Sequence, residues 1–148
     1  MAELGHIVVG VDGSENAQRA LDWAVTLARP AGARITAVHA LGLLDRVHHE
    51  RVPSASHHDE IAEAFRSEWC AVLDDAGVPC DRIVVDGTPA DVILATAAER
   101  GADLVVVGER GSDGPASGGP ARELGSTSRR VLEGADRPVL VVPHEQLP

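Results

Sequence analysis

Residues 102–111 read ADLVVVGERG, and residues 125–142 read GSTSRRVLEGADRPVLVV. In the first stretch a continuous apolar run over Leu104–Val107 ends at Gly108, a pattern typical of a strand that is buried on both faces of a sheet. The second stretch opens with a helix start, Gly-Ser, and returns to an apolar strand over Val139–Val142. A glycine-lined turn that leaves a parallel strand and enters a helix N-terminus is a common binding site for phosphate.

Apolar runs alternate with helical patterns along the rest of the chain. Three further strands are predicted, over Ile7–Val11, Ile35–Ala40 and Arg82–Val85. Helices are predicted after Ser14, from about Asp59 to Ala76, after Thr88 and over Thr127–Glu133. No hairpin turn joins consecutive strands, so we expect an α/β fold with a parallel sheet and helices on both faces. In such sheets a ligand binds at the carboxyl ends of the strands, where the strand order reverses.

Short-range signals set several helix boundaries. Ser14 is predicted to cap the first helix, and Pro30 with Gly32 should end it. Thr88 is followed three residues later by Asp91, which predicts a capping box at the start of the third helix. These signals depend on a few neighbouring residues and not on how the sheet is arranged.

The segment Leu41–His58 is the least regular part of the chain, and we expect a solvated loop there. It contains two pairs of adjacent histidines, His48-His49 and His57-His58. An adventitious metal is the alternative, but no cysteine or clear carboxylate set completes a site, and adjacent histidines on a loop rarely face one centre. We therefore predict no metal site.

The composition favours one globular domain over residues 1–148. Of the 148 residues 44% are hydrophobic but only 2% are aromatic, so the core must be built from small aliphatic side chains. The net charge of −10 argues against nucleic acid or an anionic membrane as the main partner. The sequence has no apolar run of membrane-spanning length and no signal peptide pattern, so we expect a cytoplasmic protein.

The chain contains no lysine, because all 13 basic residues are arginine. A Walker A loop needs a lysine on the phosphates and a Schiff base needs an amine, so both chemistries are excluded. Phosphate would have to be bound by backbone amides, hydroxyls or arginine. Cys70 and Cys80 are not in a CxxC spacing, and we expect reduced, buried thiols.

The candidate site lies at the ends of two strands. Asp12 follows the first strand and Gly108 ends the fourth, so both face one crevice if these strands are neighbours. Asp12 would either accept hydrogen bonds from an adenine or ribose or support the turn before Ser14, and the two readings weigh equally. Gly108, Gly111 and Gly125 would let the backbone approach a ligand without a Cβ clash.

The helix that follows Gly125 offers further phosphate-binding groups. Its first amides have no partner within the helix, and Ser126 and Ser128 carry hydroxyls. Arg129 and Arg130 lie in the first turn, where a cation opposes the helix dipole at a cost of roughly 0.3–1 kcal/mol. A bound anion would offset that cost; the alternative is that both side chains are simply solvated.

Six motifs mark the chain: IVVGVDGS at 7–14, VHA at 38–40, DGTPADVI at 86–93, ADLVVVGERG at 102–111, GSTSRRVL at 125–132 and RPVLVVP at 137–143. In combination they make the chain resemble the universal stress protein family over nearly its whole length. The resemblance implies a Rossmann-like, five-stranded parallel sheet in the order 3-2-1-4-5, in which strands one and four are neighbours. It also implies a homodimer paired through the last strand, at Val139, Leu140, Val141 and Val142.

The ATP-binding branch of this family carries the motif G-x2-G-x9-G-[ST], to which Gly108, Gly111 and the pair Gly125-Ser126 are similar. Thirteen residues, 112–124, separate the second and third glycines here, and an insertion in a loop is thermodynamically mild. The resemblance places the base and ribose at Val11, Asp12 and Ala40, and the adenine beside Val107. It places the ribose and phosphates at Gly108, Gly111, Gly125, Ser126, Thr127 and Ser128.

The resemblance leads us to expect a dimeric stress-response regulatory module that binds ATP, with or without Mg²⁺, or else AMP, ADP or cyclic AMP. The lack of lysine and of an evident base argues against a fast ATPase, and slow hydrolysis or autophosphorylation is left open. The alternative is a nucleotide-independent dimeric interaction or scaffold protein. A nucleotidyl transferase ranks last, because the chain has no His-x-Gly-His motif.

Overall fold

Five parallel strands form one sheet in the order β3-β2-β1-β4-β5. The computed structural model describes residues 3–41, 55–110 and 124–144 of the chain. The strands are β1 (His6–Gly10), β2 (Arg34–Ala40), β3 (Cys80–Val85), β4 (Leu104–Gly108) and β5 (Val139–Val142). The predicted α/β fold and its strand order are therefore confirmed.

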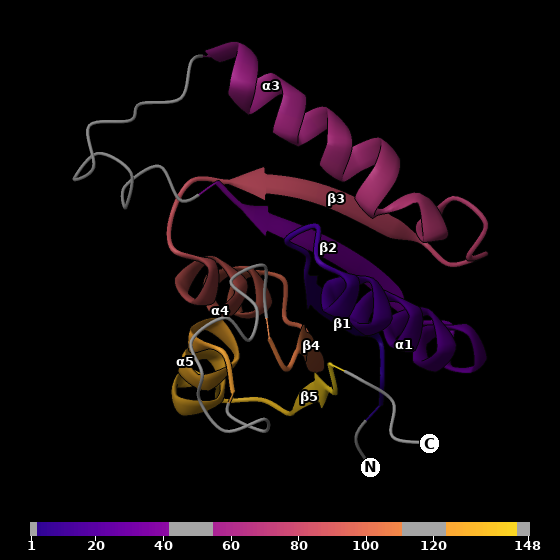
Figure 1. The fold of residues 1–148 in the computed structure, drawn as a ribbon. Helices are drawn as coiled ribbons and strands as arrows, with labels where there is room; N and C mark the ends of the chain where they lie inside the picture. Colours follow the sequence, from indigo (N-terminus) through magenta and orange to yellow (C-terminus); the bar gives the residue numbers. More distant parts are fainter. Residues whose placement is uncertain (1–2, 42–54, 111–123, 145–148) are drawn as a thin grey trace.

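Helices cover both faces of the sheet. They are α1 (Glu15–Ala31), α3 (Ala55–Ala64), α4 (Pro89–Glu99) and α5 (Ser126–Gly134), and α3 continues into a π-helical turn, η1 (Phe65–Trp69), and a 3₁₀ turn, η2 (Ala71–Leu73). Helices α1 and α3 lie on one side of the sheet, and α4 and α5 lie on the other (Figure 1). None of the helices in the described part of the chain is long and apolar enough to cross a membrane.

The core consists of two apolar layers because successive strand residues point to opposite faces. On β1, Ile7 and Val9 pack in the layer of α1 and η1, whereas Val8 packs with α4 and α5. All three side chains are fully buried. This two-sided burial explains why the strands read as continuous apolar runs.

The pairing of β1 with β4 creates the edge on which the candidate site depends. Ile7 lies opposite Leu104, and Val9 lies opposite Val106, with the two strands parallel. Their carboxyl ends therefore reach the same edge of the sheet, together with the end of β2. The predicted neighbourhood of Asp12 and Gly108 follows from this register.

Helix α1 begins as predicted but ends differently. The Ser14 hydroxyl accepts a hydrogen bond from the amide of Ala17 (3.1 Å), which confirms its role as N-cap. Gly32 ends the helix in the left-handed conformation, with φ of 65°. The prediction that Pro30 would end the helix is wrong, because Pro30 lies in the last turn. The helix continues for only one residue after the proline, to Ala31, so the disturbance is confined to its last turn.

The segment before β3 departs most from the prediction. Helix α3 begins at Ala55 and not near Asp59, so His57 and His58 lie in a helix and not in a loop. The other predicted loop residues, 42–54 with His48 and His49, lie outside the described residues. The predicted continuous helix to Ala76 is also wrong, since it gives way to η1 and η2.

The π-helical turn has a packing reason. The amide of Cys70 donates to the carbonyl of Phe65 five residues earlier (3.1 Å), and both side chains are fully buried. In a regular α-helix two residues five apart point in directions about 140° from each other. The wider turn brings both side chains onto the sheet.

Helix α4 starts at the predicted place with a different cap. Thr88 is the N-cap and Pro89 the first helical residue, as the motif indicated. However, the Thr88 hydroxyl donates to the Asp91 carboxylate (2.6 Å), and the Thr88 side chain makes no capping bond to an amide. The two side chains thus bond to each other, so the predicted capping box is wrong in its hydrogen bonds.

Candidate functional site

The end of β1 is held in place by backbone and side-chain contacts. The amide of Val11 donates to the carbonyl of Val38 on β2 (2.9 Å), and Val11 is buried. The next residue, Asp12, accepts hydrogen bonds at Oδ1 from the amide (3.0 Å) and hydroxyl (2.6 Å) of Ser14. Asp12 therefore supports the turn into α1, one of the two roles that the sequence left open.

The end of β4 lies directly against α1. A Cβ added to Gly108 would come within 2.7 Å of Cγ of Asn16, so a glycine is needed here for packing as well as for any ligand. Asn16 is buried, and its amide nitrogen donates to the carbonyls of Val142 (3.0 Å) and Pro143 (3.1 Å). Its Oδ1 accepts from the amide of Arg110 (2.7 Å). Sequence analysis missed Asn16, although a polar residue on the buried stripe of a helix is a usable signal.

Glu109 connects the end of β4 to both later elements. Its amide donates to the carbonyl of Val142 (2.8 Å), and its carbonyl accepts from the amide of Gly125 (2.9 Å) and from the Ser128 hydroxyl (2.9 Å). Its carboxylate accepts from the amide of His144 (2.8 Å) and is directed to the end of β5. These bonds bring the start of α5 to the end of β4.

The start of α5 carries the predicted phosphate-binding groups. Gly125 is the N-cap and provides no side-chain cap, while Ser126 is exposed and Thr127 half-buried. The buried Ser128 hydroxyl donates to the carbonyls of Glu109 and Gly125 (3.1 Å), so it holds the turn itself. Backbone amides in the first turn of a helix have no partner within the helix and lie at its positive end.

The nine described residues of the predicted set lie along one edge of the sheet. Val11 and Asp12 follow β1, Ala40 ends β2, and Val107 and Gly108 end β4, with the four others at the start of α5. Val107 and Ala40 pack in the layer of α4 and α5, on the side where α5 begins. The tenth residue, Gly111, lies outside the described residues.

Cations near this helix start have structural partners. Arg130 forms an exposed ion pair with Asp91 of α4 (3.8 Å). The charge of Arg130 is thus partly balanced without a bound anion, so its position does not by itself indicate a phosphate.

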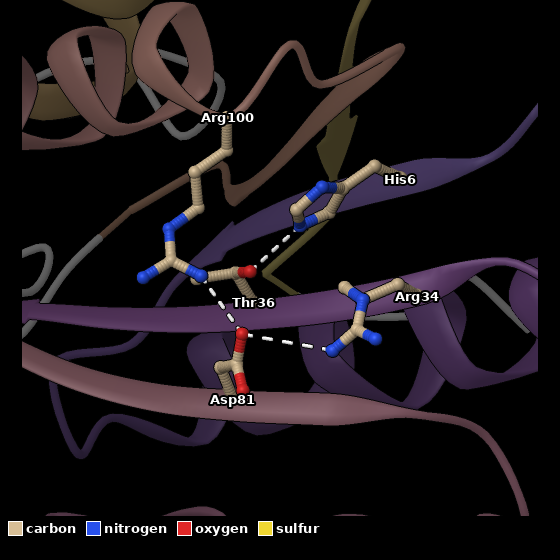
Figure 2. Close-up of polar contacts among 5 residues, drawn as sticks. All are labelled: His6, Arg34, Thr36, Asp81 and Arg100. Atoms are coloured by element: carbon tan, nitrogen blue, oxygen red, sulfur yellow. Dashed lines mark hydrogen bonds and ion pairs between the residues drawn. The ribbon is translucent and has the colours of Figure 1, made fainter.

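The opposite edge of the sheet carries a separate polar cluster (Figure 2). Nε2 of His6 is hydrogen-bonded to the hydroxyl of the fully buried Thr36 (2.7 Å), and the guanidinium groups of Arg34 (3.7 Å) and Arg100 (2.8 Å) both contact Asp81. Burial lowers the pKa of His6 below its ordinary value, and the charges of Arg100 and Arg34 act in the same direction, while a hydrogen bond with the Arg100 backbone and the charge of Asp81 oppose them. The cluster joins the end of α4 to the first three strands.

No group of three or more histidine, cysteine, aspartate or glutamate side chains in the described part of the chain could hold a metal. A shallow depression lies at the opposite edge, where β4 and β5 begin, and is lined by Glu3, Leu4, Ala102, Asp103, Leu104, Asp136, Arg137 and Pro138. It is remote from the predicted residues.

The fold and the edge together define a class: open, parallel α/β proteins in which a helix start meets the switch point of the sheet. The sequence matches the universal stress protein family over residues 3–143. The chain therefore belongs to the universal stress protein family.

Solved structures agree with this assignment. A universal stress protein UspA from Lactobacillus plantarum is 27% identical, with a TM-score of 0.75, over 96% of this chain and 99% of the other. A universal stress protein in complex with cAMP is 27% identical, with a TM-score of 0.73, over 97% and 100%. One from Archaeoglobus fulgidus in complex with dAMP is 23% identical, with a TM-score of 0.67, over 96% and 99%, and shows the fold alone. A search of curated protein sequences found no match.

Proposed function

We propose that this protein is a stress-response module that binds an adenine nucleotide where β1, β2 and β4 end and α5 begins. The observation that carries the proposal is the start of α5, a glycine-capped helix N-terminus fixed to the end of β4 by the bond from Gly125 to Glu109. Such a terminus binds phosphate through its amides and its dipole. A similar structure, 27% identical, is described in complex with cAMP, which supports an adenine nucleotide as the ligand class.

Each predicted residue has a part in this proposal. The base and ribose would lie near Val11, Asp12, Ala40 and Val107, and the phosphates near Gly108, Gly111, Gly125, Ser126 and Thr127. Ser128 would position the turn, since its hydroxyl is already bonded to two carbonyls. ATP, with or without Mg²⁺, is the proposed ligand, and AMP, ADP and cyclic AMP are the competing ones.

We propose a ligand-binding role and not fast hydrolysis. The chain has no lysine to place on the phosphates. The Glu109 carboxylate, which follows β4, is bonded to the amide of His144. Slow hydrolysis would be a side reaction of a site built for binding.

A charge variant tests the site without threatening the fold. Ser126→Asp places a carboxylate at an exposed position in the first turn of α5, where it stabilises the helix but repels phosphate. Affinity for ATP should fall about tenfold or more, because like charges about 4 Å apart cost on the order of 1–4 kcal/mol near a surface. Isothermal titration calorimetry measures the affinity, and Ser126→Asn is the uncharged control.

The purified protein itself decides between the two functions. Adenine nucleotide released on denaturation, or bound near one per chain in titration, supports the proposal and identifies the nucleotide. A protein that carries none and ignores millimolar ATP contradicts it, and would favour the nucleotide-independent interaction protein.

We further propose that two copies pair through β5. This strand lies at the end of the sheet, and the carbonyls of Pro138 and Val142 accept bonds from the β4 side. Because backbone groups alternate along a parallel strand, those of Val139 and Val141 point away from β4. An exposed strand edge is a template for pairing with another chain.

Proline substitution tests this interface. Val141→Pro removes an outward donor and should convert the dimer to monomer, as measured by sedimentation equilibrium. Val84→Pro, at an outward-facing position of the other edge strand, is the control and should leave the dimer intact. A dimer that survives Val141→Pro would contradict pairing through β5.

A further inference from the structure

Three rings gather behind the turn that carries Asp12. The ring of His39 on β2 lies 5.8 Å from that of Phe65 and 5.0 Å from that of Trp69, measured between centroids. Phe65 and Trp69, both in η1, lie 6.3 Å apart with their planes at 75°. We call His39, Phe65 and Trp69 the aromatic brace.

The indole of Trp69 lies against the turn itself. Gly13 has φ of 86°, and a Cβ added there would come within 2.8 Å of Cε2 and Cζ2 of Trp69. A glycine thus meets two demands at once, a left-handed backbone and close contact with the indole ring. The turn cannot shift toward η1 without a collision with Trp69.

The other side of Asp12 is held by His39. Its Nδ1 lies 2.8 Å from the carbonyl oxygen of Val11. Because a carbonyl only accepts, Nδ1 carries the hydrogen in this bond. Val11 and Gly13, the two neighbours of Asp12 in sequence, are therefore each fixed by one ring of the brace.

The position of Trp69 is itself specified by one further contact and by the conformation of η1. The side-chain amide of Gln18 donates to the Trp69 carbonyl (2.7 Å), which ties η1 to α1. The wide, π-helical turn of η1 also gives Trp69 a direction that it would not have in a regular α-helix. Single π-helical turns occur frequently at functional sites.

We propose that Trp69 and His39 are positioning residues for the adenine-nucleotide site: they fix the Val11–Gly13 turn so that it presents Asp12 to the ligand. This inference rests on the nucleotide site proposed above. It gives η1, which contributes no residue to the predicted set, a role in holding this turn of the site in place. A fixed turn binds more tightly because less ordering is needed at the moment of binding.

The first experiment uses Trp69 as its own reporter. Trp23 is an exposed residue of α1, and Trp23→Phe leaves Trp69 as the single tryptophan. Titration with ATP, and separately with AMP, should change the Trp69 emission with a midpoint equal to the dissociation constant from calorimetry. Binding by calorimetry without any change in emission would overturn the link between the brace and the site.

Substitutions then measure how much the brace contributes. Trp69→Ala should weaken ATP binding roughly tenfold, as expected if the turn adopts its binding conformation only about a tenth of the time without the indole. Trp69→Phe keeps a ring against Gly13 and should stay within about threefold of the parent, and Trp23→Ala should leave affinity unchanged. Equal affinity in Trp69→Ala and the parent would overturn the proposal.

A nucleotide-free measurement separates this inference from the proposed function. The amide of Ser14 is bonded to Asp12, so its hydrogen exchange reports on the turn. In Trp69→Ala this exchange should rise toward that of an open loop, because the turn would then be open most of the time, while amides of β1 keep their protection. A parent that binds no nucleotide refutes the proposed site alone. Unchanged hydrogen exchange at Ser14 refutes the positioning role of the aromatic brace. If Trp69→Ala does not fold, the affinity of Trp69→Phe and the emission titration test that role instead.

Discussion

Asn16 joins three separate segments through one buried side-chain amide. It bonds to the carbonyls of Val142 and Pro143 and to the amide of Arg110. Asn16→Ala should lower the free energy of unfolding by about 2–4 kcal/mol, because each buried polar group left without a partner costs about 1–3 kcal/mol. Urea denaturation measures the loss. Asp22→Ala, on the exposed side of α1, is the control and should change little.

Gly108 and Asn16 should be energetically coupled. Gly108→Ala pushes a methyl group against the Asn16 side chain and should cost about 1–3 kcal/mol in the parent. In the Asn16→Ala background the same substitution should cost less, because the space is vacated. A double-mutant cycle by urea denaturation measures the difference, and simple additivity would contradict the contact.

At the scale of single residues, the sequence predicted the roles that depend on residues nearby in the chain. Ser14 was recognised as a cap because an N-cap is defined within four residues. The hydrogen-bond partners of Asn16 and the contact of Trp69 with Gly13 could not be predicted, because both depend on elements distant in the sequence. Asp12 had two equally weighted roles, and the structure shows the turn-supporting one.

The end of α1 illustrates how one position limits a helix. Gly32 adopts φ of 65°, and its amide donates to the carbonyl of Arg29 (3.2 Å). No atom lies within 4 Å of a Cβ added there, so only backbone strain opposes a side chain. Gly32→Ala should cost about 1–2 kcal/mol of unfolding free energy, and Gly32→Asn should cost less because asparagine tolerates the left-handed region.

Thermal and urea denaturation of the two Gly32 variants test this prediction. Equal stability of Gly32→Ala and the parent would show that the helix end relaxes to another conformation.

At the scale of elements, the presence of each helix and strand was predicted well because apolar periodicity is a strong signal. Pro30 and the π-helical turn were not predicted, since local rules treat proline as a stop and assume a constant helical period.

The whole molecule has an unusual alkaline titration because it contains neither lysine nor tyrosine. Burial raises the pKa of the Cys70 thiol to about 12. In the unfolded chain a cysteine ionises near pH 8.5. Between those values the unfolded state binds fewer protons than the folded state, so stability should fall as pH rises, by up to about 1.4 kcal/mol per pH unit.

Denaturation from pH 8 to pH 11 measures this dependence. Cys70→Ala should flatten the decline although it lowers stability at neutral pH through the cavity it leaves. Cys80→Ala, which removes the half-buried thiol, is the control and should keep the slope. A parent whose stability does not change above pH 9 would contradict the buried thiol.

The fold as a whole was predicted in two ways. Alternation of strands and helices indicated a parallel sheet, whereas the strand order came from the family resemblance, because local patterns do not specify which strands are neighbours. The candidate site was predicted as a set of strand-end and helix-start residues. The aromatic brace was not predicted, because η1 is distant in the sequence from the predicted site residues and belongs to none of the motifs that identify them.

The pairing of β1 with β4 has a consequence for how the chain is made. Ile7 lies opposite Leu104, so most of the chain must be synthesised before β1 can pair with its second neighbour, β4. During synthesis β1, α1, β2 and β3 can associate early, but one edge of β1 stays open until β4 emerges from the ribosome. Such an edge favours wrong pairing in a nascent chain. The proposed nucleotide site is therefore assembled late, and its ligand can stabilise the finished protein without guiding the early steps of its folding.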